Sequence, residues 1–177
     1  TFNVFDEANS APVEYGYTTG EGPSAKDEAA GVLFARQGMN IKMGFGANIL
    51  GFRYLLLNST SFTDKELAEV EGFNIQPNTS FARTSYQAAK DVWNLDESRI
   101  RELKSFAIEN RRMDNLHERA KVALDSAEVA ANGRRWEDFV RFTREAIGLE
   151  SRAYPDVRST QNDVVQGIIF FMALVIP

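Results

Sequence analysis

Cysteine is absent from this chain of 177 residues. Its absence excludes disulfides, thiolate nucleophiles and the zinc or iron–sulfur sites that use cysteine ligands. Histidine occurs only once, at His117, and His117-Glu118 begins like the helical zinc-protease motif. Lys121 stands where that motif needs its second histidine. We therefore expect His117 to be a solvent-facing or cap-like residue of a charged helix, and we predict no metal site, no cofactor and no enzymatic activity.

Nucleotide-binding motifs are also missing. Residues 44–51 are rich in glycine but lack the Gly-Lys-Ser/Thr of a phosphate-binding loop, and their glycine spacing misses the dinucleotide fingerprint by one residue. Glycines in a twisted strand or hairpin account better for this segment. An enzyme that uses carboxylates is a further alternative without support from any motif. The carboxylates in question are Asp6, Glu7, Asp27 and Glu28.

The chain lacks an excess of positive charge. Its 20 Lys and Arg are outnumbered by 25 Asp and Glu, and the net charge is -5. Binding to phosphate backbones requires a basic surface, so we predict no nucleic-acid partner. The basic residues between positions 99 and 121 are interleaved with acidic ones, which is typical of a solvated, ion-paired helix face. Contact with lipid headgroups is the alternative for this charged segment.

The first part of the chain, residues 1–62, is predicted to be β-rich. Short segments of alternating or continuous apolar residues predict strands. These segments are 1–6, 31–35, 39–45 and 52–57. In one of them, Met39, Ile41, Met43 and Phe45 are expected on a buried face, with Asn40 and Lys42 on the opposite face.

Loops and a connector account for the rest of the first half. Residues 9–28 are rich in Gly, Pro, Ser and Thr and predict a long loop. Residues 63–93 are predicted to be a connector, with one short helix over 63–71 and irregular structure over 72–85.

The segment 94–154 is predicted to be an antiparallel helical hairpin. Asn94 followed by Glu97 resembles a capping box and would start the first helix, with a possible break near 110–115. Asn132-Gly133 would end it. Apolar residues recur three and four positions apart on both sides of that pair, as in a coiled coil. The two stripes are Leu116, Ala120, Ala123, Ala127 and Ala130, and Phe139, Phe142, Ala146, Leu149 and Ala153.

A long apolar run occurs only near the C-terminal end. Pro155 is expected to end or kink the second helix, or to begin a third one. Residues 156–177 are predicted to form a helix that enters the membrane, because the run covers roughly half of the about 20 apolar residues that a span needs. The residues expected to contact membrane or partner are Ile168, Ile169, Phe170, Phe171, Met172, Leu174, Val175 and Ile176. Since the sequence begins at Thr1 and stops inside this run, we expect a longer parent chain.

The C-terminal half resembles the membrane-proximal helical segment of large, uncharacterised bacterial surface proteins with carboxypeptidase-regulatory-like domains. The resemblance rests on these segments of residues 95–177: Leu116-His117-Glu118-Arg119-Ala120, Trp136-Glu137-Asp138-Phe139, Arg144-Glu145-Ala146, 150–157 and 162–170. In that family a transmembrane helix follows directly. The resemblance implies a scaffold or anchor and brings no catalytic residues with it.

These observations predict an α+β protein, with a β-rich N-terminal part, a helical hairpin and the start of a membrane helix. The function we expect is that of a non-enzymatic, membrane-anchored, extracytoplasmic structural or docking segment. Its expected partners are membrane lipid and either other protein subunits or the rest of the parent chain. An accessory subunit of a larger membrane complex, held by the apolar C-terminal helix, is the alternative.

Overall fold

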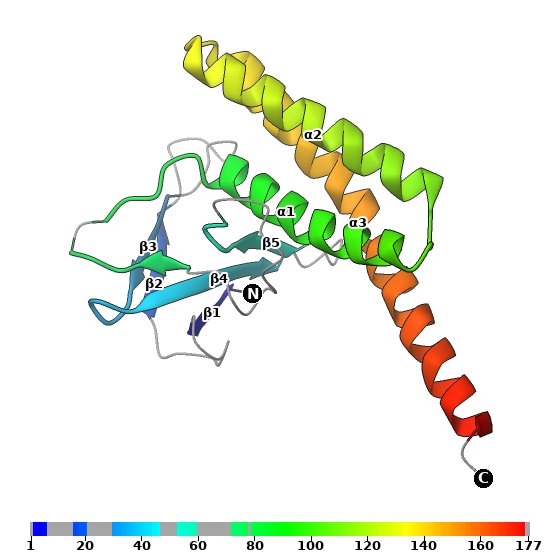
Figure 1. Ribbon diagram of the computed structural model, residues 1–177. Helices are drawn as coiled ribbons and strands as arrows, with labels where there is room; N and C mark the ends of the chain where they lie inside the picture. Colours follow the sequence, from blue (N-terminus) through cyan, green and yellow to red (C-terminus); the bar gives the residue numbers. More distant parts are fainter. Residues whose placement is uncertain are drawn as a thin grey trace.

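The protein is an α+β structure that combines a small antiparallel sheet with three helices (Figure 1). The computed structural model describes residues 2–6, 16–20, 30–46, 53–59, 72–77 and 79–175. The predicted fold class is thereby confirmed at the level of α+β. The short helix predicted over 63–71 lies outside the described residues.

The main sheet is built around one central strand, β4 (Asn40–Gly46). This strand pairs antiparallel with β1 (Phe2–Asp6), β5 (Arg53–Leu56) and β6 (Phe73–Asn74). A separate antiparallel pair consists of β2 (Gly16–Gly20) and β3 (Ala30–Phe34). One sequence prediction fails here, because the expected loop over 9–28 contains β2. The predicted strand over 31–35 is found as β3, which exposes Val32 and Phe34.

The predicted alternation in β4 is confirmed for the buried face. Ile41 and Met43 are buried and pack with Val4 and Leu56, and Met39 lies against the same cluster. Lys42, which alternates with them along the strand, is also buried, with 4% of its surface exposed. The side chain of Phe45 is outside the description. β4 is therefore covered on both faces at its centre, and the period-two pattern identifies only one of them.

The first helix, α1, spans Thr84–Ser105. It begins ten residues before Asn94, so the predicted capping box and the boundary at residue 94 are wrong. Arg83 precedes the helix in a left-handed conformation with no side-chain cap, which leaves no sequence signal for its start. The predicted break near 110–115 exists slightly earlier, over 106–110, and Asn110 caps the next helix through its side chain.

The second and third helices, α2 (Arg111–Asn132) and α3 (Trp136–Val175), form the predicted antiparallel hairpin (Figure 1). Ala127 is buried with Phe139, and Ala123 with Ala146 and Leu149, which confirms the predicted seam of alanines against larger side chains. Pro155 neither ends α3 nor begins a new helix, because it lies within one continuous helix of 40 residues. The left-handed residue of the tip is Arg134, with φ 55°, and Gly133 has φ -80°.

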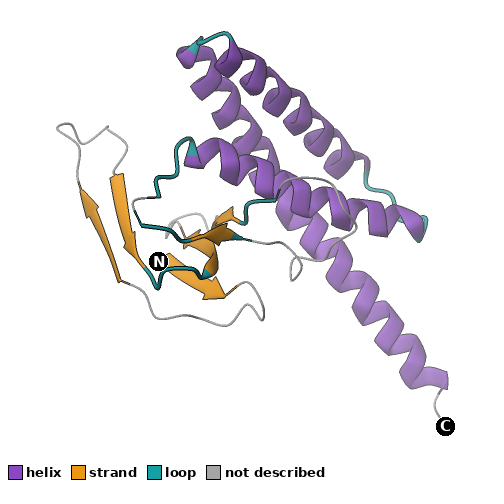
Figure 2. Cartoon of the chain, turned by 60° about the vertical axis from the view of Figure 1, so that its left-hand side comes forward, coloured by secondary structure: helices purple, strands orange, loops and turns teal. Residues whose placement is uncertain are grey.

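α1 is the middle layer of the molecule, between the sheet and the hairpin (Figures 1 and 2). Ala88 packs into the core of the sheet, whereas Ala89 and Trp93 pack against α2 and α3. A second tie to the sheet is polar. The buried carboxylate of Asp91 accepts hydrogen bonds from the backbone N–H groups of 57, 58 and 59 at 2.7, 3.2 and 2.9 Å. α1 thus fixes the position of the hairpin relative to the sheet.

Candidate functional site

The C-terminal end of α3 projects beyond the rest of the protein (Figure 1). Seven large apolar side chains in this segment are between 55% and 80% exposed. They are Ile168, Ile169, Phe170, Phe171, Met172, Leu174 and Val175, and we call this set the apolar end. Seven of the eight contact residues predicted from the sequence are thus found on one exposed segment, and Ile176 lies outside the described residues.

The apolar end has no polar side. Successive helical residues differ by about 100° in direction, so Ile168 through Phe171 point to all sides of the helix. All four side chains are exposed, and the rings of Phe170 and Phe171 contact each other at 5.9 Å. An amphipathic helix lying on a protein surface would instead keep one polar face. No described residue outside this segment covers any side of the apolar end.

The apolar end is attached to the body through a small core at the crossing of the three helices. Val157 is fully buried there with Ile100, Leu103 and Met113, and Val164 packs against this cluster from one turn before the apolar end. The path of the projecting segment is therefore set by packing between 157 and 164.

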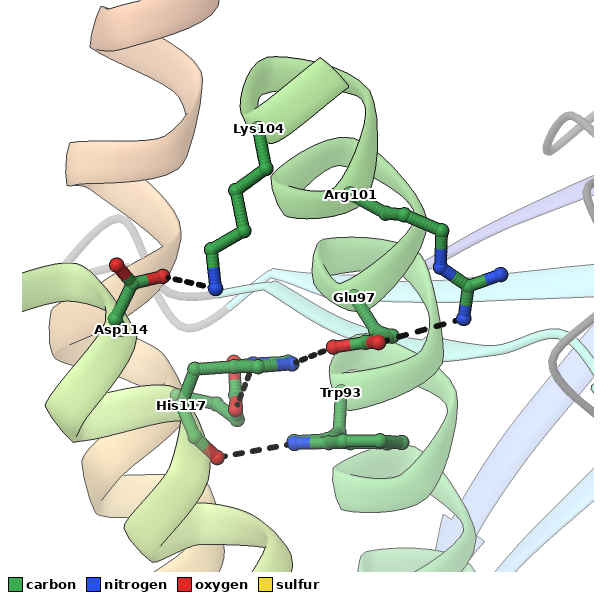
Figure 3. A network of polar contacts seen from close by, with 7 residues as sticks. Trp93, Glu97, Arg101, Lys104, Asp114 and His117 are labelled. Carbon is green, nitrogen blue, oxygen red and sulfur yellow. Dashed lines mark hydrogen bonds and ion pairs between the residues drawn. The ribbon is translucent and has the colours of Figure 1, made fainter. Parts of the chain in front are cut away.

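Beside this core lies a cluster of ionisable side chains, which we call the polar joint. It comprises Trp93, Asp96 and Glu97 from α1, His117 from α2 and Glu150 from α3. Nδ1 of His117 lies 2.9 Å from Oε1 of Glu150, and Nε2 lies 3.0 Å from Oε2 of Glu97 (Figure 3). Only the imidazolium form donates from both ring nitrogens, so this geometry fits a protonated ring held between two carboxylates.

Trp93 fixes the orientation of the histidine. Its indole ring stacks on the His117 ring with 4.7 Å between centroids and 6° between planes. Its Nε1–H donates a 3.0 Å hydrogen bond to the backbone carbonyl of His117 (Figure 3). An aromatic face attracts a cation, so the stacking also favours the protonated ring.

Asp96 and Glu150 bring two buried carboxyl groups together. Asp96 is 0% and Glu150 1% exposed. Burial, together with the negative charge of Glu150, raises the pKa of Asp96 to about 8 despite the opposing charge of Arg99. Asp96 is therefore protonated at neutral pH. In that form it donates to Glu150, which lies within hydrogen-bonding reach.

Exposed ion pairs surround the polar joint. Arg101 reaches Glu97 at 3.4 Å, and Lys104 of α1 reaches Asp114 of α2 at 2.9 Å (Figure 3). The hydrogen bond that Lys104 donates to Asp114 raises the pKa of Lys104. On the other side, Arg112 of α2 lies 3.6 Å from Asp156 of α3. These contacts are solvent-exposed and contribute little individually, but they join the same three helices.

The expectation of a solvent-facing His117 is wrong, because the residue is 5% exposed. It belongs to the buried stripe of α2, together with Met113, Ala120 and Leu124. Asp96 and Glu150 likewise interrupt buried stripes, with Ile100 near the first and Ala153 near the second. An ionisable residue at an apolar position of a helical stripe was the sequence signal for this joint.

The joint offers no open coordination site. Both ring nitrogens of His117 are taken by carboxylates, and no group of three or more His, Asp or Glu in the described residues is placed to hold a metal ion.

None of the described helices is both long enough and apolar enough to cross a bilayer. Comparison with protein-family models, curated proteins and solved structures finds no match to this chain.

Proposed function

We propose that this chain is a non-enzymatic structural or docking segment that is anchored to a membrane by the apolar end of α3. The exposed area carries the proposal. Each of the seven side chains exposes on the order of 100 Å², so together they exceed the few hundred Å² that an ordinary soluble surface presents as one patch. A patch of this size needs an apolar environment.

Lipid hydrocarbon is the occupant that fits the shape of the apolar end. A protein groove covers one side of a bound helix and leaves the opposite side polar. The apolar end is exposed and apolar on all sides, so it matches a solvent that surrounds it. The segment Ile168–Val175 rises about 12 Å, less than the ~30 Å hydrocarbon core, so it would enter the membrane without crossing it.

The proposal that the chain is non-enzymatic rests on the chemistry of the polar joint. Its titratable groups are buried and bind one another, whereas a catalytic constellation needs a cavity that admits substrate. An extracytoplasmic location is part of the proposal, because a chain without cysteine has no thiol to oxidise in an oxidising compartment.

Vesicle flotation tests the anchor. The full chain should float with phosphatidylcholine vesicles. A Phe170→Ser/Phe171→Ser variant should bind roughly 100-fold more weakly, since it lacks two aromatic side chains whose burial in lipid contributes about 3 kcal/mol or more to the binding free energy. The matched control is Val122→Ser/Val129→Ser, because these two valines on α2 are 62% exposed and lie outside the apolar end. The control should bind like the wild type.

Two results would contradict the anchor. One is that the wild-type protein does not float with the vesicles and instead forms a defined complex with another protein through the apolar end. That result would assign the end to a protein partner, as in the accessory-subunit alternative. The other is equal loss of binding in both variants, which would make vesicle binding a general effect of surface hydrophobicity.

A further inference from the structure

We propose that Asp96 and Glu150 form a proton-binding pair that controls how α3 is held against α1. With one proton between the two carboxyl groups, the helices are joined. When the proton leaves, two negative charges face each other in a buried contact, and the joint opens.

The buried acceptors of the polar joint support such a proton. Both carboxylate oxygens of Asp96 and Oε2 of Glu150 are buried and have no hydrogen-bond partner among the described residues. The two ring nitrogens of His117 are already directed at Glu97 and at Oε1 of Glu150. A proton on Asp96 turns the contact between two acceptors into a hydrogen bond and satisfies both side chains at once.

The other charged groups around the pair do not replace the proton. From α1, Arg99 forms an ion pair with Oδ1 of Asp96 at 3.6 Å, and its charge opposes the rise in the pKa of Asp96 without reversing it. The guanidinium is also placed over the ring of Tyr154 from α3 at 5.5 Å. Glu97, also from α1, adds negative charge, and the His117 ring from α2 lies between Glu97 and Glu150. One imidazole ring and one guanidinium thus face three carboxyl groups.

The direction of the pH effect follows from proton linkage. The pKa of Asp96 is about 8 in the closed joint and near the ordinary 3.8 once the residue is exposed to water. The closed form therefore binds one proton more between these two values. The ratio of open to closed joint should rise up to tenfold per pH unit from about pH 4 to about pH 8 and level off above.

The absence of cysteine makes the joint accessible to distance measurement. Spin labels on Glu102→Cys and Arg158→Cys report the separation of α1 from α3, because both positions are exposed. Labels on Glu128→Cys and Arg144→Cys report the hairpin as a control. From about pH 5 to about pH 9, the first distance distribution should shift or broaden, and the second should not change.

Asp96→Asn is the decisive variant, because asparagine keeps a donor toward Glu150 and cannot ionise. It should make the first distance independent of pH, whereas Glu145→Gln, at an exposed position on α3, should behave like the wild type. Carboxyl-carbon NMR of the wild-type protein provides a second measurement if the variant fails to fold. An Asp96 resonance that titrates near pH 4, or a wild-type distance that does not respond to pH, would overturn the proposal.

Discussion

At the scale of single residues, the buried charges of this protein are held by partners from other elements. Asp91 is the clearest case. Besides the backbone N–H groups of 57, 58 and 59, it accepts a 3.0 Å hydrogen bond from the side chain of Gln87. Burial raises the pKa of Asp91, and these four hydrogen bonds oppose the rise. One carboxylate thus positions α1 on the segment that directly follows β5.

Replacing Asp91 with asparagine should destabilise the protein by about 2–4 kcal/mol. Both carboxylate oxygens of Asp91 accept hydrogen bonds from N–H groups, and in the variant an NH2 group would face some of these donors. Chemical denaturation monitored by circular dichroism measures the change. Asp125→Asn serves as the control, since the side chain of Asp125 is 57% exposed and its ion pair is with the neighbouring Lys121 on the same helix. The control should change stability by less than about 1 kcal/mol. Equal effects in the two variants would show that the contact to residues 57–59 does not stabilise the fold.

Ala107 offers a prediction of the opposite sign. It follows α1 with φ 57°, in the left-handed region that glycine adopts without steric cost. Ala107→Gly should therefore raise stability by roughly 0.5–1 kcal/mol. Ala82→Gly, at an exposed position without a positive φ, should be neutral or destabilising. The melting temperatures of both variants provide the comparison. A lower melting temperature for Ala107→Gly would show that the backbone at position 107 is not strained.

At the scale of elements, the α2–α3 hairpin is the part most fully determined by local sequence. Its seam combines small side chains on α2 with large ones on α3. Ala127 and Ala130 are 0% exposed, and Phe139 is 8% exposed. Alanine at these positions lets the two helices approach closely, and a larger side chain would have no space.

Ala127→Leu should overpack the seam and lower the free energy of unfolding by roughly 1–3 kcal/mol. Val129→Leu introduces a side chain of the same type at a position that is 62% exposed, so it should have little effect. Denaturant midpoints of the two variants provide the comparison. Tolerance of leucine at both positions would mean that the hairpin is loosely packed.

The hairpin and β4 could be predicted because their patterns are local. Alanine and aromatic stripes at helical spacing, and alternation at Ile41 and Met43, need only a few neighbouring residues to be recognised. The start of α1 could not be predicted, because Arg83 provides no capping side chain. The polar joint was missed for a different reason. His117 meets partners 20 and 33 residues away on two other helices, and no local pattern encodes such a meeting.

At the scale of the whole molecule, α3 belongs to two environments. Its first part is the second arm of the hairpin, its middle packs on α1 and α2 through Val157 and Val164, and its last turns project into the surroundings. The apolar end makes no contribution to the described core. Shortening α3 in steps should therefore separate folding from anchoring.

A chain that ends at Gly167 should keep the melting temperature of the full protein within about 2 °C, because a change below about 0.5 kcal/mol shifts a domain of this size by about 1–2 °C. It should also lose vesicle binding and any need for detergent. A chain that ends at Asp163 loses Val164 from its packing against the helix-crossing cluster and should melt a few degrees lower. A chain that ends at Pro155 loses Val157, which is fully buried, and should be destabilised by about 2 kcal/mol or more. Differential scanning calorimetry and flotation of the same three proteins test this order. If the chain ending at Gly167 unfolds, the apolar end is part of the core, and the membrane anchor loses its structural basis.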